Sequence, residues 1–246
     1  MKWFHWLWVV VVALSLSAVV HAKEKEKDKD AASKKVDSGS FGVFIKGRRV
    51  GTETFSITQS ASGSVIRSEF KAEGAAGQAV QDSELQLTGS GEVRRYEWKE
   101  QSPGKAQSLV TPNEQFLTQK WSLGPEDKPQ DQPYLLPPST NILDDYFFVH
   151  REVLAWKYLG GACSREKEGL RCPRAQFGTM NPRQHSSSPA SMEYLGREKV
   201  KVHDAERELN KLELKSDAGN WLIWLDDQFM VLRISILSEG TEVIRD

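Results

Sequence analysis

Residues 141–159 are the one stretch of this chain with the periodicity of a long amphipathic helix; the rest has the alternation of strands or the composition of loops. Asn141 has the chemistry of an N-cap, and Asp144 follows three positions later, as in a capping box. Gly160 and Gly161 follow the stretch, where glycine commonly ends a helix in left-handed geometry. A lone helix in a β-patterned chain must bury its apolar face against a sheet, so this stretch constrains the fold most.

Two apolar stripes run along the predicted helix at about 100° per residue. The stripes contain, in turn, Ile142, Tyr146, Val149, Val153 and Trp156, and Leu143, Phe147, Leu154 and Tyr158. His150 and Lys157 lie between the stripes. The helix therefore combines a wide apolar face with one titratable and one cationic side chain set into it.

Alternation with a period of two begins at Phe41 and predicts an opening hairpin with its turn geometry at Gly47 and Gly51. Similar segments recur along the chain, and residues 221–225 are apolar on both faces, as in a strand that is covered on both sides. The predicted fold class is mainly β (α+β): a curved antiparallel sheet or half-barrel, with the long amphipathic helix packed across its concave face. Residues 123–138, with five of the ten prolines, predict an irregular crossing loop, and residues 181–190 predict a polar loop.

The N-terminus has the features of a secretory signal peptide over residues 1–22, with a basic start at Lys2, an apolar core and small residues before Lys23. The alternative is an uncleaved membrane anchor, because the apolar run approaches the roughly 18 to 20 residues that span a bilayer. Residues 23–39 predict a charged, disordered tether, and residues 40–246 a single antiparallel β domain around the helix. A periplasmic or secreted location follows, with no membrane span once the signal is removed.

The chain contains 33 basic and 34 acidic residues, so its charge does not favour nucleic acid as a partner. Its two cysteines, Cys163 and Cys172, follow the predicted helix. In an exported protein such an isolated pair is best explained by a disulfide. A zinc site would need further ligands, and the spacing is not that of a C-x-x-C redox motif.

No catalytic motif is present. The chain lacks a G-x-S-x-G elbow, an H-E-x-x-H helix and a phosphate-binding glycine loop. The adjacent carboxylates at Asp144–Asp145 and Asp226–Asp227 diverge on either a helix or a strand, and are explained by a helix start and a hairpin turn. We therefore expect no enzyme, cofactor or metal; a hydrolase would require distant residues to converge.

The segments G-R-R-V-G-T-E-T-F near the start, and W-L-D-D-Q-F-M-V-L-R and E-G-T-E-V-I-R near the end, together with the central helix, resemble a group of exported bacterial proteins. That group is similar in outline to the periplasmic carriers of lipoproteins and lipids, whose fold is a curved antiparallel half-barrel lidded by helices. The resemblance implies a carrier fold, and it transfers no functional residue. This chain departs from those carriers in having one evident helix rather than several.

Two functions of different class follow. The first is a binding or carrier protein that holds an apolar, lipid-like ligand between sheet and helix. In it His150 or Lys157 meets the anionic or hydroxylated head group, while the remaining site residues contact the apolar part: Tyr146, Phe147, Val153, Leu154 and Trp156. The second is a cell-envelope structural or adaptor protein whose helix plugs the sheet and whose edge strand binds another envelope protein. A cavity between helix and sheet favours the first function, and its absence favours the second.

The signal-peptide interpretation predicts that the mature chain begins at Lys23. N-terminal sequencing of protein recovered from the periplasm or the medium tests it. A chain that starts at Met1 and fractionates with membranes would support the uncleaved anchor instead.

Overall fold

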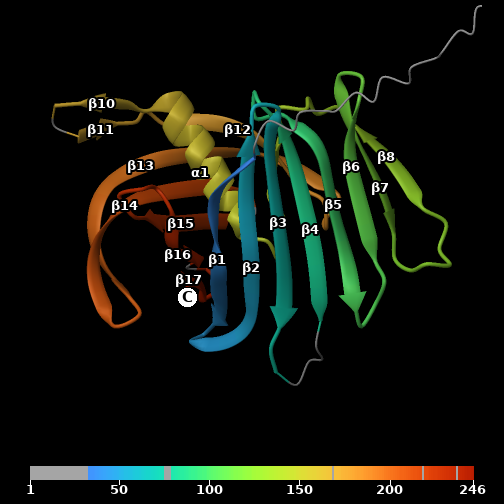
Figure 1. Cartoon of the computed structure of the whole chain (residues 1–246), viewed down its shortest axis with the longest axis horizontal. Helices are drawn as coiled ribbons and strands as arrows, with labels where there is room; N and C mark the ends of the chain where they lie inside the picture. The colour runs from blue at the N-terminus through green and yellow to red at the C-terminus, as the bar shows by residue number, and fades with distance from the viewer. Residues whose placement is uncertain (1–32, 75–78, 168, 218, 237) are drawn as a thin grey trace, which may run out of the picture. The chain divides into compact units, whose positions relative to one another are not determined.

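The computed structural model describes residues 33–246 apart from 75–78, 168, 218 and 237. These residues form seventeen strands and one helix. Fifteen of the strands belong to one sheet of order β8-β7-β6-β5-β4-β3-β2-β1-β17-β16-β15-β14-β13-β12-β9, and β10 and β11 form a separate hairpin (Figure 1). Within the described residues the sheet is not closed into a barrel, since β8 and β9 are its two edges. The prediction of a mainly β chain is confirmed.

The first eight strands follow one another as antiparallel neighbours. They are β1 (Lys34–Ile45), β2 (Arg48–Ser60), β3 (Gly63–Ala72), β4 (Val80–Thr88), β5 (Val93–Ser102), β6 (Gln107–Asn113), β7 (Phe116–Ser122) and β8 (Gln130–Tyr134). The later strands of the sheet are β9 (Asn141–Ile142), β12 (Ala175–Asn181), β13 (Ser186–Val202), β14 (Ala205–Ser216), β15 (Gly219–Leu225), β16 (Val231–Ile236) and β17 (Thr241–Arg245). The antiparallel pairing of β1 with β17 joins the first and the last described strands at the middle of the sheet.

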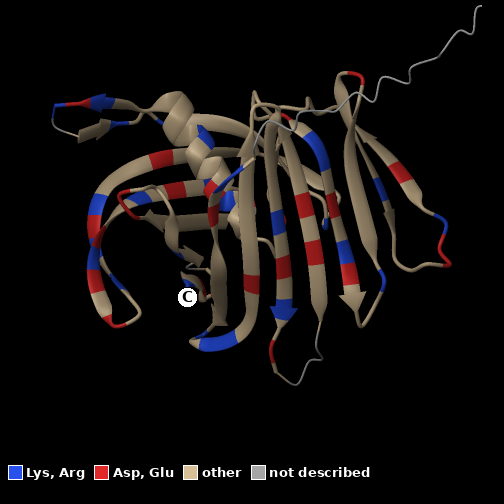
Figure 2. Cartoon of the chain, in the orientation of Figure 1, with Lys and Arg blue, Asp and Glu red and all other residues tan. Residues whose placement is uncertain are grey.

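Strand alternation places apolar side chains on one face of the sheet and charged pairs on the other. In β2, Phe55 and Ile57 are buried. On the other face of the neighbouring strands, Arg67 pairs with Glu84 at 2.7 Å; β3 and β5 carry charged residues of both signs, and those of β4 are acidic (Figure 2). One face of this part of the sheet is therefore packed and the other faces water, as the alternation predicted.

The opening hairpin turns at Lys46 and Gly47, whose φ angles of 48° and 76° lie in the left-handed region. This is where the sequence placed the turn, and glycine adopts that geometry without strain. Gly51 instead lies within β2, where an added Cβ would approach the Phe70 ring to 2.4 Å. Its role is close packing rather than turning.

The predicted long helix over residues 141–159 is wrong. The helix α1 is Val149–Ala162, 14 residues long, and within the described residues no long helix crosses a concave face. Asn141–Ile142 forms β9, which pairs with Thr179 and Met180 of β12, so the backbone there is committed to the sheet. At the other end α1 runs through both glycines to Cys163, whose extended φ and ψ of −95° and 146° end it.

Three other boundaries differ from the sequence prediction. β1 begins at Lys34, so residues 34–39 of the predicted tether pair with β2 instead of remaining free. β8 lies within the predicted crossing loop of residues 123–138. β13 begins within the predicted polar loop of residues 181–190. In each case main-chain pairing with a neighbouring strand outweighs a polar or proline-containing composition.

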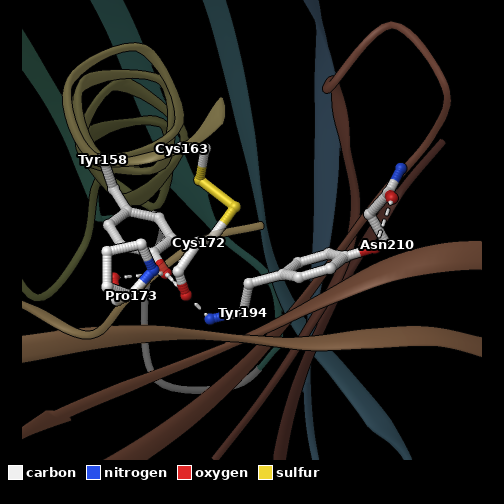
Figure 3. Close-up of a disulfide and its surroundings, with 6 residues drawn as sticks. All are labelled: Tyr158, Cys163, Cys172, Pro173, Tyr194 and Asn210. Carbon is white, nitrogen blue, oxygen red and sulfur yellow. Dashed lines mark hydrogen bonds between the residues drawn. A yellow bond between two sulfur atoms is a disulfide. The ribbon is translucent and has the colours of Figure 1, made fainter. Parts of the chain in front are cut away.

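The predicted disulfide is confirmed, since Cys163 and Cys172 are bonded. They close the loop that contains β10 (Ser164–Glu166) and β11 (Gly169–Arg171), directly after α1. The Tyr158 hydroxyl lies 3.1 Å from the carbonyl oxygen of Pro173 and accepts a hydrogen bond from the Tyr194 amide at 3.0 Å (Figure 3). The disulfide loop is thereby tied through α1 to β13.

In the part of the chain that the structure describes, α1 falls short of the length and apolar character that a bilayer-crossing helix requires. The predicted signal peptide, residues 1–22, and residues 23–32 of the tether lie outside the described residues.

The burial of α1 predicts a large effect of removing a leucine side chain from it. Leu154 is 1% exposed, so Leu154→Ala should lower the free energy of unfolding by about 2 to 5 kcal/mol. Urea unfolding measures this difference. Leu135→Ala is the control, because Leu135 is 84% exposed, and it should change stability by less than about 0.5 kcal/mol. Equal effects of the two substitutions would contradict this packing of α1.

Candidate functional site

The first turn of α1 is bound by a carboxylate from the sheet. Phe148 precedes the helix and makes no capping bond of its own. Instead, Glu53 of β2 accepts hydrogen bonds from the Phe148 amide at 2.7 Å and the Val149 amide at 3.3 Å. A carboxylate suits a helix N-terminus because the amides there lack partners and the helix dipole is positive. Burial raises the pKa of Glu53 to about 7, even though the bonds from Ser68, Phe148 and Val149 lower it.

A second buried carboxylate organises the segment before α1. Asp144 accepts hydrogen bonds from the Tyr96 hydroxyl at 2.6 Å, Nε of Arg183 at 2.7 Å and the Tyr146 amide at 2.9 Å. It is fully buried, and Arg183 stacks its guanidinium over the ring of Trp98 at 4.1 Å. Asp144 therefore joins β5, the β12–β13 turn and the approach to α1, instead of beginning the helix as the sequence predicted.

Arg151 carries a guanidinium into the interior from the first turn of α1. It is 2% exposed, donates from one terminal nitrogen to the carbonyl oxygens of Asp144 and Phe147, and lies 4.2 Å above the Trp221 ring. Its Nε has no hydrogen-bond acceptor among the described residues. Burial lowers the pKa of Arg151, while neighbouring carboxylates, Asp145 first, raise it. A buried guanidinium with unused donor capacity is unusual, because unpaired polar groups are costly in the interior.

Glu152 of α1 lies close to Asp37 and Arg245. Asp37 of β1 forms an ion pair with Arg245 of β17 at 2.5 Å. Burial, and then the neighbouring Asp37 carboxylate, raise the pKa of Glu152 to about 10. Burial also acts to raise the pKa of Asp37, but the hydrogen-bonded Arg245 guanidinium holds it below its usual value. The raised pKa of Glu152 favours its protonated form at neutral pH.

The two head-group residues predicted from the sequence do not meet. His150 is buried against the rings of Tyr96 and Phe147, and its ring nitrogens have no hydrogen-bond partner among the described residues. Burial, with the nearby arginines, lowers the pKa of His150 to about 3, so the ring is neutral. Lys157 is half-buried and its ammonium group donates to Asn141 Oδ1 at 3.0 Å and to the Ser139 carbonyl oxygen at 3.2 Å. Neither residue lines a described cavity near α1.

The predicted apolar contacts are divided between core and surface. Phe147 and Leu154 are in the core, and Val153 and Trp156 are half-buried beside it. Trp156 donates its indole N–H to the Phe229 carbonyl oxygen at 2.6 Å. Tyr146 is 40% exposed and is the one member of the predicted set that lines a cavity.

Two adjoining cavities lie at the N-terminal end of α1. The larger, of about 410 Å³, has apolar walls that include Val43, Ile45, Val50, Phe70, Phe148 and Ile236. The smaller, of about 200 Å³, is lined mainly by residues of polar type, with Ser186, Ser187, Ser188, Ser216, Thr179 and Asn181 among them. Asp145, Gln184 and Trp221 line both cavities, so the two cavities share one wall.

Sequence reasoning missed Glu53, Asp145 and Arg151. For Glu53 a signal was present, because it shares the inward register of β2 with Phe55 and Ile57 and so breaks an apolar pattern with a carboxylate. For Asp145 and Arg151 the sequence contained no such signal, because the predicted helix included both residues. Among the described residues no group of three or more His, Cys, Asp or Glu side chains has the arrangement of a metal site.

Comparison of the chain with protein-family models, with curated proteins and with solved structures found no match. The function therefore has to be argued from the geometry of the site.

The buried carboxyl of Glu152 predicts a pH dependence of stability. A carboxyl whose pKa rises from 4.5 to about 10 on folding binds its proton more tightly in the folded state. Its contribution to the free energy of unfolding is complete below the pKa that Glu152 has in the unfolded chain, and it is lost as the pH rises toward 10. Between pH 7 and 9 the free energy of unfolding of the natural protein should fall by up to about 1.4 kcal/mol per pH unit more than that of Glu152→Gln. This pH range lies above the pKa of Glu53. Urea unfolding at both pH values measures it, and parallel pH profiles for the two proteins would refute a protonated Glu152.

Proposed function

We propose that this chain is an exported binding or carrier protein for an apolar, lipid-like ligand. The observation that carries the proposal is the apolar cavity of about 410 Å³ at the start of α1. Cavities of a few hundred Å³ with mainly apolar walls and a few polar groups are the usual form of small-molecule sites. The proposed ligand position is this cavity. It differs from the position expected from the sequence, in which His150 or Lys157 meets the ligand.

The walls of the cavity suit an acyl chain or another flexible apolar group. Phe70, Phe148 and Ile236 are almost completely buried and form a fixed apolar interior. Ile45 and Tyr146, in contrast, are 44% and 40% exposed, although both are large apolar or aromatic side chains. Exposed apolar side chains that continue into an apolar cavity are typical of a ligand entrance.

Two features support export. The Cys163–Cys172 disulfide is of the kind that persists in oxidising compartments. The N-terminal sequence has the composition of a signal peptide. A periplasmic or secreted location is part of the proposal.

The adaptor function is less well supported. It needs a sheet edge that accepts a partner strand, but both edge strands are short: β8, Gln130–Tyr134, has five residues and contains Pro133, and β9, Asn141–Ile142, has two. Short edge strands that contain proline are a common protection against strand addition. A helix that only plugged the sheet would also leave no cavity beside it.

The cavity predicts the effect of a charge at its entrance. Ile45→Asp should weaken the binding of the neutral probe N-phenyl-1-naphthylamine by about tenfold, or about 1.4 kcal/mol, because it places a carboxylate beside an apolar ligand. Fluorescence titration measures this binding.

Leu195→Asp is a matched control. Leu195 on β13 is 45% exposed, against 44% for Ile45, and does not line the cavity. Its variant should bind the probe as the natural protein does. Absence of probe binding to the natural protein, or equal weakening by both substitutions, would refute the proposed site.

A further inference from the structure

The smaller cavity has the composition of a head-group site. Its serine, threonine and asparagine side chains supply hydroxyl and amide groups, and it adjoins the apolar cavity along the shared wall of Asp145, Gln184 and Trp221. An amphiphile that places its tail in the larger cavity would bring its polar end to this compartment.

Arg151 supplies the positive side of the compartment. Among the described residues it is the one basic side chain that lines either cavity. One terminal nitrogen of Arg151 donates hydrogen bonds to backbone carbonyl oxygens, and one face of the guanidinium covers the Trp221 ring. Its buried Nε has no acceptor among the described residues. An anionic group of a ligand in the smaller cavity would be attracted by the positive charge of Arg151, which lines it.

Asp145 supplies the negative side. Its two carboxylate oxygens are oriented by amide groups, from Asn181 at 2.8 Å and from Gln184 at 3.1 Å. In the described part of the chain Asp145 forms no ion pair, although the Arg151 charge is close enough to interact with it. The carboxylate thus has fixed geometry, lies beside both cavities and has no cation in contact with it.

The charge balance of the two cavities selects between head groups. Asp145, Asp217 and Glu239 line them, against Arg151 alone. A purely anionic head would bring more negative charge toward this acidic lining, whereas a head with an ammonium group and an anionic group matches both Asp145 and Arg151.

We propose that the smaller cavity binds the zwitterionic head group of an amphiphile, with its ammonium group at Asp145 and its anionic group toward Arg151. This inference rests on the proposed function, because the tail lies in the apolar cavity. It differs from the sequence expectation, in which His150 or Lys157 met an anionic head, and it makes a head with both charges the preferred ligand.

Displacement of N-phenyl-1-naphthylamine tests the proposal. The competitors are lysophosphatidylethanolamine and lysophosphatidic acid with the same acyl chain, both below their micelle concentrations; they differ in the ethanolamine ammonium group and in the charge of the phosphate, which is a monoester in lysophosphatidic acid. The natural protein should bind lysophosphatidylethanolamine more tightly by about tenfold. Asp145→Asn keeps the size of the side chain and removes its charge, and should abolish most of this preference. Asp204→Asn, in the exposed turn between β13 and β14, is the control and should retain it.

The outcomes separate the two proposals. Failure of the probe and of both amphiphiles to bind would overturn the proposed function. Binding of both amphiphiles with equal affinity, or tighter binding of lysophosphatidic acid, would leave the apolar cavity as the ligand site and overturn the zwitterionic head-group site. A preference that persists unchanged in folded Asp145→Asn would also overturn it.

Discussion

The hydrogen bonds from the Phe148 and Val149 amides to the Glu53 carboxylate determine where α1 begins, and the candidate site depends on that position. A helix start leaves several amides without partners, and a buried start needs a fixed acceptor. β2 provides one at a defined point of the sheet. Phe148 then contributes to the apolar cavity and Arg151, three residues later, to the polar one, so both cavities are consequences of the same contact.

The interior beside α1 contains several buried ionisable side chains. Glu53, Asp144, Arg151 and Glu152 are all buried at the N-terminal end of the helix or against it. Buried ion pairs are seldom more stabilising than apolar side chains of the same shape, because desolvation offsets much of their attraction. The polar groups do, however, fix geometry: Asp144 holds Arg183 and Tyr96, and its carbonyl oxygen accepts from Arg151. The proposed site, with one carboxylate and one guanidinium in fixed positions, would gain from such a framework.

The apolar cavity draws its walls from distant parts of the chain. Val43 and Val50 come from the opening hairpin, Trp221 and Ile236 from β15 and β16. They meet because β17 pairs with β1 and places the last strands beside the first. Tyr146 and Phe148 complete the cavity from the segment that leads into α1. A ligand there would contact both ends of the chain and the helix start together, and would stabilise their association.

Local pattern was enough to predict the mainly β character, the hairpin turn at Gly47 and the Cys163–Cys172 disulfide, because alternation, turn chemistry and a lone cysteine pair act over short distances. It was not enough to place the helix. Residues 141–148 have helical periodicity, but β12 pairs with Asn141–Ile142, and Tyr96 and Arg183 bind Asp144, so long-range contacts outweigh local preference there. The same shift hid Asp145 and Arg151, whose positions in the candidate site depend on where the helix begins. That position is decided by Glu53, nearly one hundred residues away in sequence, through hydrogen bonds that exist only once β2 and α1 have packed together.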